Sequence, residues 1–87
     1  MGTGGLAEPW YRARSRADIA SAVRKARRRL GANQIDFAAR AGVSRSTLQR
    51  LERGDDVSLD ALLAVFAELG LEAILVPRGA QLTVGPR

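Results

Sequence analysis

The stretch from Asn33 to Gly54, NQIDFAARAGVSRSTLQRLERG, constrains the fold more than any other part of the sequence. It holds two short segments with apolar residues at helical spacing, joined by a glycine corner at Gly42. Asn33 and Ser44 each stand directly before one of these segments. Both residue types are favoured as helix N-caps because their side chains accept hydrogen bonds from unpaired backbone N–H groups. The stretch therefore predicts two short helices, over residues 34–41 and 45–53, separated by a tight turn.

The second of these helices separates core residues from hydrogen-bonding ones. The expected core residues of the two helices and their corner are Phe37, Ala38, Val43, Leu48 and Leu51. The remaining faces of the second helix carry Arg45, Ser46, Gln49 and Arg50. One helix propped against another with a polar exposed face is typical of a helix-turn-helix, whose second helix enters the major groove of DNA.

The charge distribution supports a polyanionic partner. The 87-residue chain has a net charge of +5 and a pI near 11.3. Residues 1–54 carry twelve Arg or Lys against four acids, whereas residues 55–87 carry two against five. A basic front and an acidic back suit a small domain that faces phosphate with one end only.

Composition excludes several kinds of chemistry. The chain has no Cys and no His, which rules out disulfides, thiolate or imidazole metal sites and Cys- or His-based nucleophiles. No glycine-rich phosphate loop or recognisable pair of catalytic carboxylates occurs, so we expect neither an enzyme nor a bound cofactor. Because no apolar run approaches about 20 residues and no signal-peptide pattern opens the chain, we expect a cytoplasmic, nucleoid-associated protein.

The segments before the central stretch divide into a lead-in and a helix. Residues 1–14 are Gly-rich and lack periodicity, which predicts a flexible segment whose Trp10 and Tyr11 either pack on the domain or contact a partner. Ser15 and Asp18 form a capping box that opens a helix over residues 17–30. Its expected core stripe is Ile19, Ala22, Val23, Ala26 and Leu30, and Arg24, Arg27 and Arg28 are placed opposite.

A fourth helix is predicted over residues 59–69, capped by Ser58 and stopped by Gly70. Its broad apolar face, which should close the core and whose margin could contact a second chain, comprises Leu59, Leu62, Leu63, Val65, Phe66 and Leu69. We therefore expect three parts in the chain. Residues 1–14 form a flexible segment, residues 15–70 a DNA-binding domain, and residues 71–87 a dimerisation strand with a short tail.

The sequence changes character after Gly70, because LEAILV is apolar on both faces and ends at Pro77. A lone strand leaves its backbone groups unpaired, so it needs a partner. Either Gln81–Val84 folds back on it as a hairpin, or the same strand of a second chain pairs with it. We favour pairing across a dimer, with the hairpin as an optional addition. The expected dimerisation residues are Leu71, Ala73, Ile74, Leu75 and Val76.

Two parts of the sequence resemble a known family. The pattern Q-x-x-F-A-x-x-A-G-V-S-x-x-T-L-x-x-L-E-x-G, from Gln34 to Gly54, resembles the Xre (Cro/repressor-type) helix-turn-helix. The following S-L-D-A-L-L-A-V-F-A-E-L-G-L-E-A-I-L-V-P-R is similar to the C-terminal half of HipB-type antitoxins. The resemblance implies a mainly α, four- to five-helix, lambda-repressor-like domain whose C-terminal strand pairs across a homodimer. Ile35, at a position usually polar in the family, and the lack of a long tail depart from the pattern.

The resemblance also implies a function. A protein of this kind is a repressor of a palindromic operator, autoregulates a toxin–antitoxin operon and neutralises a HipA-type serine/threonine kinase toxin. The alternative is a stand-alone Xre-family regulator without a kinase partner.

Side-chain chemistry and the resemblance together give the candidate DNA contacts. Arginine can bridge O6 and N7 of guanine, and hydroxyl and amide groups bond base edges or phosphates. The expected base contacts are Ser44, Arg45, Ser46, Gln49 and Arg50. The expected phosphate contacts are Gln34, Thr47, Arg53 and Arg28.

Overall fold

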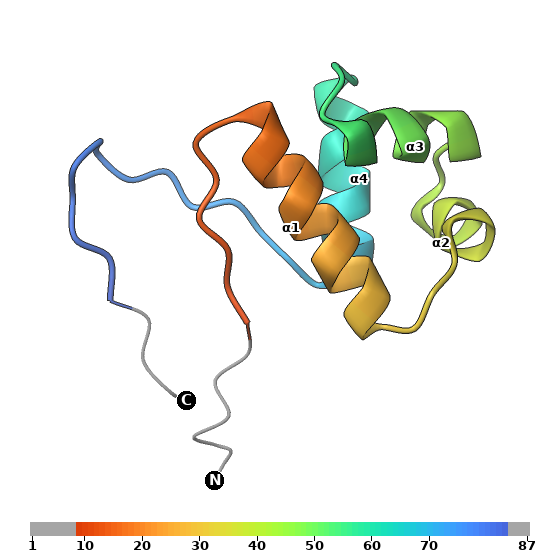
Figure 1. Cartoon of the computed structure of the whole chain (residues 1–87), viewed down its shortest axis with the longest axis horizontal. Helices are drawn as coiled ribbons and strands as arrows, with labels where there is room; N and C mark the ends of the chain where they lie inside the picture. Colours follow the sequence, from red (N-terminus) through yellow and green to blue (C-terminus); the bar gives the residue numbers. More distant parts are fainter. Residues whose placement is uncertain (1–8, 84–87) are drawn as a thin grey trace, which may run out of the picture.

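The protein is described here by a computed structural model covering residues 9–83, which contains four helices (Figure 1). They are α1 (Arg16–Arg29), α2 (Gln34–Ala41), α3 (Arg45–Arg53) and α4 (Leu59–Leu69). The mainly helical, helix-turn-helix architecture is the predicted one. Residues 1–8 of the expected flexible segment, and Val84 of the expected hairpin, lie outside the described residues.

Helix ends follow from the capping residues. The side chains of Asn33, Ser44 and Ser58 accept hydrogen bonds from the backbone N–H three residues on, as N-caps do. Gly42 ends α2 with φ of 77°, a left-handed conformation that other residues adopt at a cost, which explains the glycine at the corner. The predicted bounds of α2, α3 and α4 are therefore confirmed. Helix α1 begins and ends one residue earlier than predicted.

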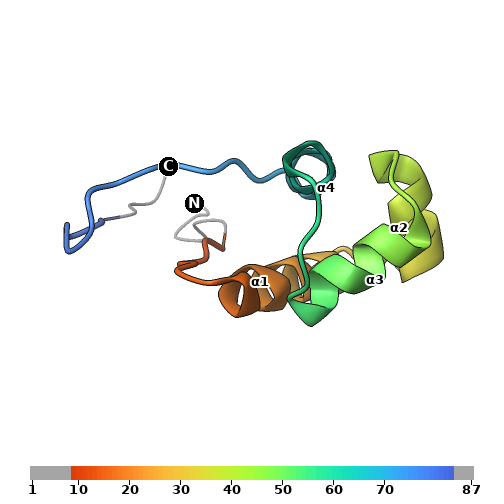
Figure 2. The ribbon, with the colours of Figure 1, turned by 90° about the horizontal axis from the view of Figure 1, so that it is seen from above.

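The core draws one fully buried side chain from each helix. These are Val23, Phe37, Leu48 and Val65, all 0% exposed. Helix α4 lies behind α1 and α3 in Figure 1, and the turned view in Figure 2 shows it set apart on one side of them. Four short helices thus enclose a single small core, and Arg45, Ser46 and Arg50 on the other faces of α3 are exposed.

Some predicted core residues are exposed. Leu30, Leu59 and Leu63 are 56%, 75% and 56% exposed. Leu30 is the C-cap of α1, at the very end of the helix. Leu59 and Leu63 lie one turn apart on α4, beside the stripe that carries Val65 inward. A helix that packs on one side buries only one stripe, so the apolar face of α4 is wider than the surface that covers it.

Residues 71–83 leave the helical body as an extended trace (Figure 1). The backbone N–H of Leu71 still donates to the carbonyl of Phe66 at 2.8 Å and completes the cap of α4. Beyond it, Ile74, Leu75 and Val76 are 72%, 95% and 47% exposed.

The predicted β-strand is not formed within this single chain. No backbone hydrogen bond joins residues 71–76 to residues 81–83, although a turn closes from the N–H of Ala80 to the carbonyl of Pro77. The local hairpin is thus absent from the described part of the chain. A strand needs a neighbour to pair its backbone groups, and residues 9–83 provide none for this segment. Pairing with a second chain stays a prediction.

Two further observations concern the surface. Trp10 is 48% exposed and Tyr11 is half-buried, so the pair is neither packed away nor free. Within residues 9–83, each helix is too short or too polar to cross a membrane.

Candidate nucleic-acid interface

The N-terminus of α3 carries a cluster of three hydroxyl groups. The Ser44 Oγ accepts a hydrogen bond from the Thr47 N–H at 3.0 Å and donates to the Thr47 Oγ1 at 2.8 Å. The Ser46 Oγ lies 3.2 Å from the same Ser44 oxygen. Ser44 therefore acts as the helix cap, and Ser46 and Thr47 are held around it.

Arg45 is exposed beside this cluster, and no hydrogen bond or ion pair within residues 9–83 holds its guanidinium. Its long side chain keeps its rotamer freedom and all five N–H donors. Among the predicted base contacts it is therefore the most available to a partner. Gln49, one turn further along α3, is half-buried.

Two predicted contacts are turned towards the loop that follows α3. The Arg50 Nη2 donates to the backbone carbonyl of Asp56 at 2.6 Å. Arg53 contacts the Asp55 carboxylate through Nε and Nη2, at 3.2 and 3.1 Å. Both arginines would have to leave these exposed partners in order to reach DNA, at a small cost typical of surface ion pairs.

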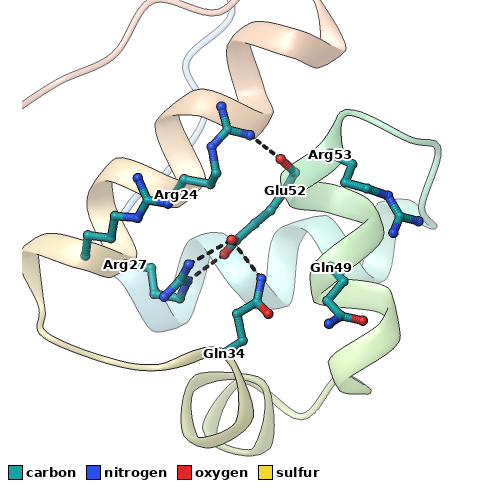
Figure 3. Close-up of a pocket in the computed structure, with 7 residues that line it drawn as sticks. Arg24, Arg27, Gln34, Gln49, Glu52 and Arg53 are labelled. Atoms are coloured by element: carbon teal, nitrogen blue, oxygen red, sulfur yellow. Dashed lines mark hydrogen bonds and ion pairs between the residues drawn. The ribbon is translucent and has the colours of Figure 1, made fainter.

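A recess of about 500 Å³ opens between α1, α2 and α3 (Figure 3). Its lining consists of Arg24, Arg27, Arg28, Gln34, Gln49, Glu52 and Arg53. The recess thus brings together four of the predicted DNA contacts, from all three helices. The hydroxyl cluster at the start of α3 and the Arg45 side chain lie outside it.

A buried ion pair forms the inner wall of the recess. Arg27 contacts Glu52 through Nε at 2.6 Å and through Nη2 at 2.9 Å. The Gln34 Nε2 donates to the same carboxylate at 3.1 Å, which fixes the amide at the start of α2 (Figure 3). Burial by itself raises the pKa of Glu52, but the hydrogen bonds from Arg27 and Gln34 hold the pKa below its usual range. The hydrogen bond to Glu52 in turn raises the pKa of Arg27.

Backbone contacts tie the same residues to the fold. The Arg27 Nη1 donates to the carbonyl of Ala32 at 2.8 Å, in the loop between α1 and α2. The Arg24 Nη1 donates to the backbone carbonyl of Glu52 near the end of α3. Two arginines of α1 therefore fix α3 relative to α1.

The solvent-facing position predicted for Arg27 is wrong, since this residue is only 8% exposed. The sequence did contain the signal. Arg27 follows Val23 by four residues and Ala20 by seven, which puts all three on one side of α1. Glu52 likewise follows the buried Leu48 by four residues. Two opposite charges on the core-facing sides of two helices are the mark of a buried pair.

The sequence of this chain matches a known family, and its fold is similar to that of solved structures. The family model described as helix-turn-helix matches residues 23–74. A structure of a HipB–O4 20mer complex superposes with a TM-score of 0.72 at 21% identity, covering 79% of this chain and 99% of that one. A HipA–HipB–O2–O3 complex gives 0.71 at 21% identity, over 79% and 99%. No curated protein matches the sequence. The match to solved structures therefore establishes the fold, and the family rests on the sequence.

Proposed function

The chain belongs to the Xre-type helix-turn-helix family, and on that premise we propose that it is a sequence-specific DNA-binding transcriptional repressor that acts as a dimer. The observation that carries the proposal is the outer face of α3. It presents Arg45, which has no hydrogen-bond or ion-pair partner among residues 9–83, next to a cluster of hydroxyls at the helix start, and the opposite side of the helix is buried in the core. A rigid helix with free donors is what reading base edges in the major groove requires.

Base reading falls to the first half of α3. Arg45 bridges O6 and N7 of a guanine, while Ser44, Ser46 and Gln49 bond neighbouring base edges. Arg50 joins them by exchanging the carbonyl of Asp56 for DNA. Gln34, Thr47, Arg53 and Arg28 hold the backbone on either side, and such phosphate contacts fix the register of the helix in the groove.

The C-terminal segment makes the dimer. Residues 15–70 form the DNA-binding unit, and residues 71–76 pair with the same segment of a second chain. The support is physical: Ile74, Leu75 and Val76 are exposed, and within residues 9–83 no neighbouring strand pairs the backbone of residues 71–76. A two-fold dimer then reads two half-sites of a palindromic operator about 34 Å apart, one turn of DNA.

We further propose that the protein is the antitoxin of a HipBA-type operon, autoregulating it and binding a HipA-type kinase. Support comes from the C-terminal sequence resemblance and from a fold shared with HipB over nearly its whole length, HipB being found in complex with HipA. The role is one of binding and not of catalysis. Co-expression with the product of the adjacent gene tests this part. Co-purification of a kinase supports the antitoxin role, whereas a chain that elutes alone as a DNA-binding dimer is a stand-alone regulator.

Arg45→Ala tests the repressor proposal. The operator is first selected by the wild-type protein from a pool of random duplexes. Loss of a bidentate contact should weaken operator binding by about 1–3 kcal/mol and relax the preference at one base pair per half-site. Lys25→Ala, which removes one exposed positive charge from α1, is the control for charge and should keep the full sequence preference. A variant at Arg45 that selects the same operator with unchanged stringency would overturn the assignment.

A further inference from the structure

The recess between α1, α2 and α3 carries more positive charge than its buried ion pair requires. Four arginines line it against a single acid, Glu52. Arg27 already neutralises the Glu52 carboxylate through two hydrogen bonds, and Gln34 donates a third hydrogen bond to it. The buried wall is therefore electrically complete, and the positive charge left over belongs to the rim.

Two of the rim arginines come from α1. Arg24 is anchored by one nitrogen to the carbonyl of Glu52, which leaves the remaining N–H groups of its guanidinium open to the recess. Arg28, one turn further along the same face of α1, is exposed and makes no hydrogen bond or ion pair within the described residues. Repulsion between neighbouring arginines is relieved when an anion sits between them.

Neutral donors converge on the same space from the other two helices. With one N–H of its amide on Glu52, Gln34 keeps a second for a ligand, and its position at the first turn of α2 is set by that bond. Gln49 faces the recess from α3 (Figure 3). Arginine and amide donors around one cavity match the several acceptor oxygens of a phosphate group.

We infer that this recess is a docking site for one phosphate of the DNA backbone, held jointly by Arg24, Arg28, Gln34 and Gln49. The inference rests on the proposed function and adds Arg24 of α1, together with a phosphate contact by Gln49, to the residues already assigned to the DNA backbone. A polymer phosphate fits better than a free phosphate compound because the recess is open and continuous with the α3 face through Gln49, which serves both. The contact sets how deeply α3 enters the groove, because α1 and α3 are tied together beneath it.

The test combines protein variants with a modified ligand. Arg24→Ala and Arg28→Ala are compared with Arg29→Ala, an exposed arginine of α1 outside the recess. Binding to a mixed-sequence duplex is measured over a range of salt concentrations. Each recess variant should weaken binding at all sequences and lower the salt slope by about one. Thermal unfolding of each variant checks the fold. Arg28, which bonds nothing in the described chain, keeps the test valid if Arg24→Ala is unstable.

A second measurement locates the phosphate. Duplexes of the selected operator carry a neutral methylphosphonate at one backbone position at a time. Wild-type protein should lose affinity at one such position in each half-site, and Arg28→Ala should lose less affinity than wild type at that position alone. Equal sensitivity of wild type and variant at every position, or a salt slope that matches Arg29→Ala, would overturn the inference while leaving the repressor proposal standing. So would competition by inorganic phosphate or a free nucleotide at concentrations too low to act as salt. Wild-type protein that binds no duplex would refute both.

Discussion

The helical body and the C-terminal segment treat apolar side chains in opposite ways. In the body, each helix delivers a fully buried residue to one core, and even a charged pair is enclosed and satisfied. In residues 71–76, five of six residues are apolar, yet Leu75 is 95% exposed. The body is therefore complete without the segment. The described residues leave this apolar segment uncovered, and the proposed pairing with a second chain would cover it.

This contrast predicts a scale of effects on the free energy of unfolding. The largest belongs to the pair inside the body. Arg27→Met leaves the Glu52 carboxylate buried without its partner and should cost about 3–5 kcal/mol, measured by urea denaturation. Replacing both residues by Met should recover most of that loss, because two apolar side chains remove the uncompensated charge. A single variant as stable as wild type would mean that the pair is not buried in solution.

Lowering the pH should also weaken this pair, with a smaller loss of stability than Arg27→Met causes. The folded-state pKa of Glu52 is depressed, so its contribution to stability is fully present above the pKa of an unfolded glutamate, about 4.3. That contribution is lost as pH falls through the lower, folded value. Urea midpoints measured from pH 6 downwards should therefore decline more steeply for wild type than for Glu52→Gln, which cannot titrate. Parallel curves would contradict the lowered pKa.

The smallest effect on the body should come from the C-terminal segment. Ile74→Asp and Leu75→Asp, one on each face, should leave the unfolding free energy of dilute protein within about 0.5 kcal/mol, as exposed substitutions usually do. Both should instead convert dimers to monomers in sedimentation experiments and weaken operator binding. Thr83→Asp, also exposed, is the control and should remain dimeric. Dimers that persist in both variants would move the interface to Leu59 and Leu63 on α4 or to the N-terminal segment.

The sequence was sufficient where local chemistry decides the structure. Asn33, Ser44 and Ser58 placed the helix starts and Gly42 placed the corner, because capping depends on residues next to one another in the chain. The buried positions of Phe37, Leu48 and Val65 followed from helical periodicity for the same reason.

It was insufficient where contacts join distant parts of the chain. Arg27 and Glu52 are 25 residues apart, so helical spacing indicates that each faces the core but not how closely their side chains meet. The recess depends on three helices meeting, so Arg24 was not identified as part of it. Arg50 was expected at the bases by its place on α3, but the carbonyl of Asp56, set by the following loop, accepts its hydrogen bond. Which DNA groups these residues reach stays a prediction.

The contacts between α1 and the last turn of α3 also limit which residues can change when the preferred DNA sequence changes. Glu52 holds Arg27, Gln34 and Arg24 at once, so the end of α3 cannot vary without loosening three helices. Arg45, Ser46 and Gln49 make no hydrogen bond to another helix within residues 9–83. Related operators can thus be acquired by exchanging these three residues on an unchanged frame, and a library confined to them should yield folded proteins with new targets.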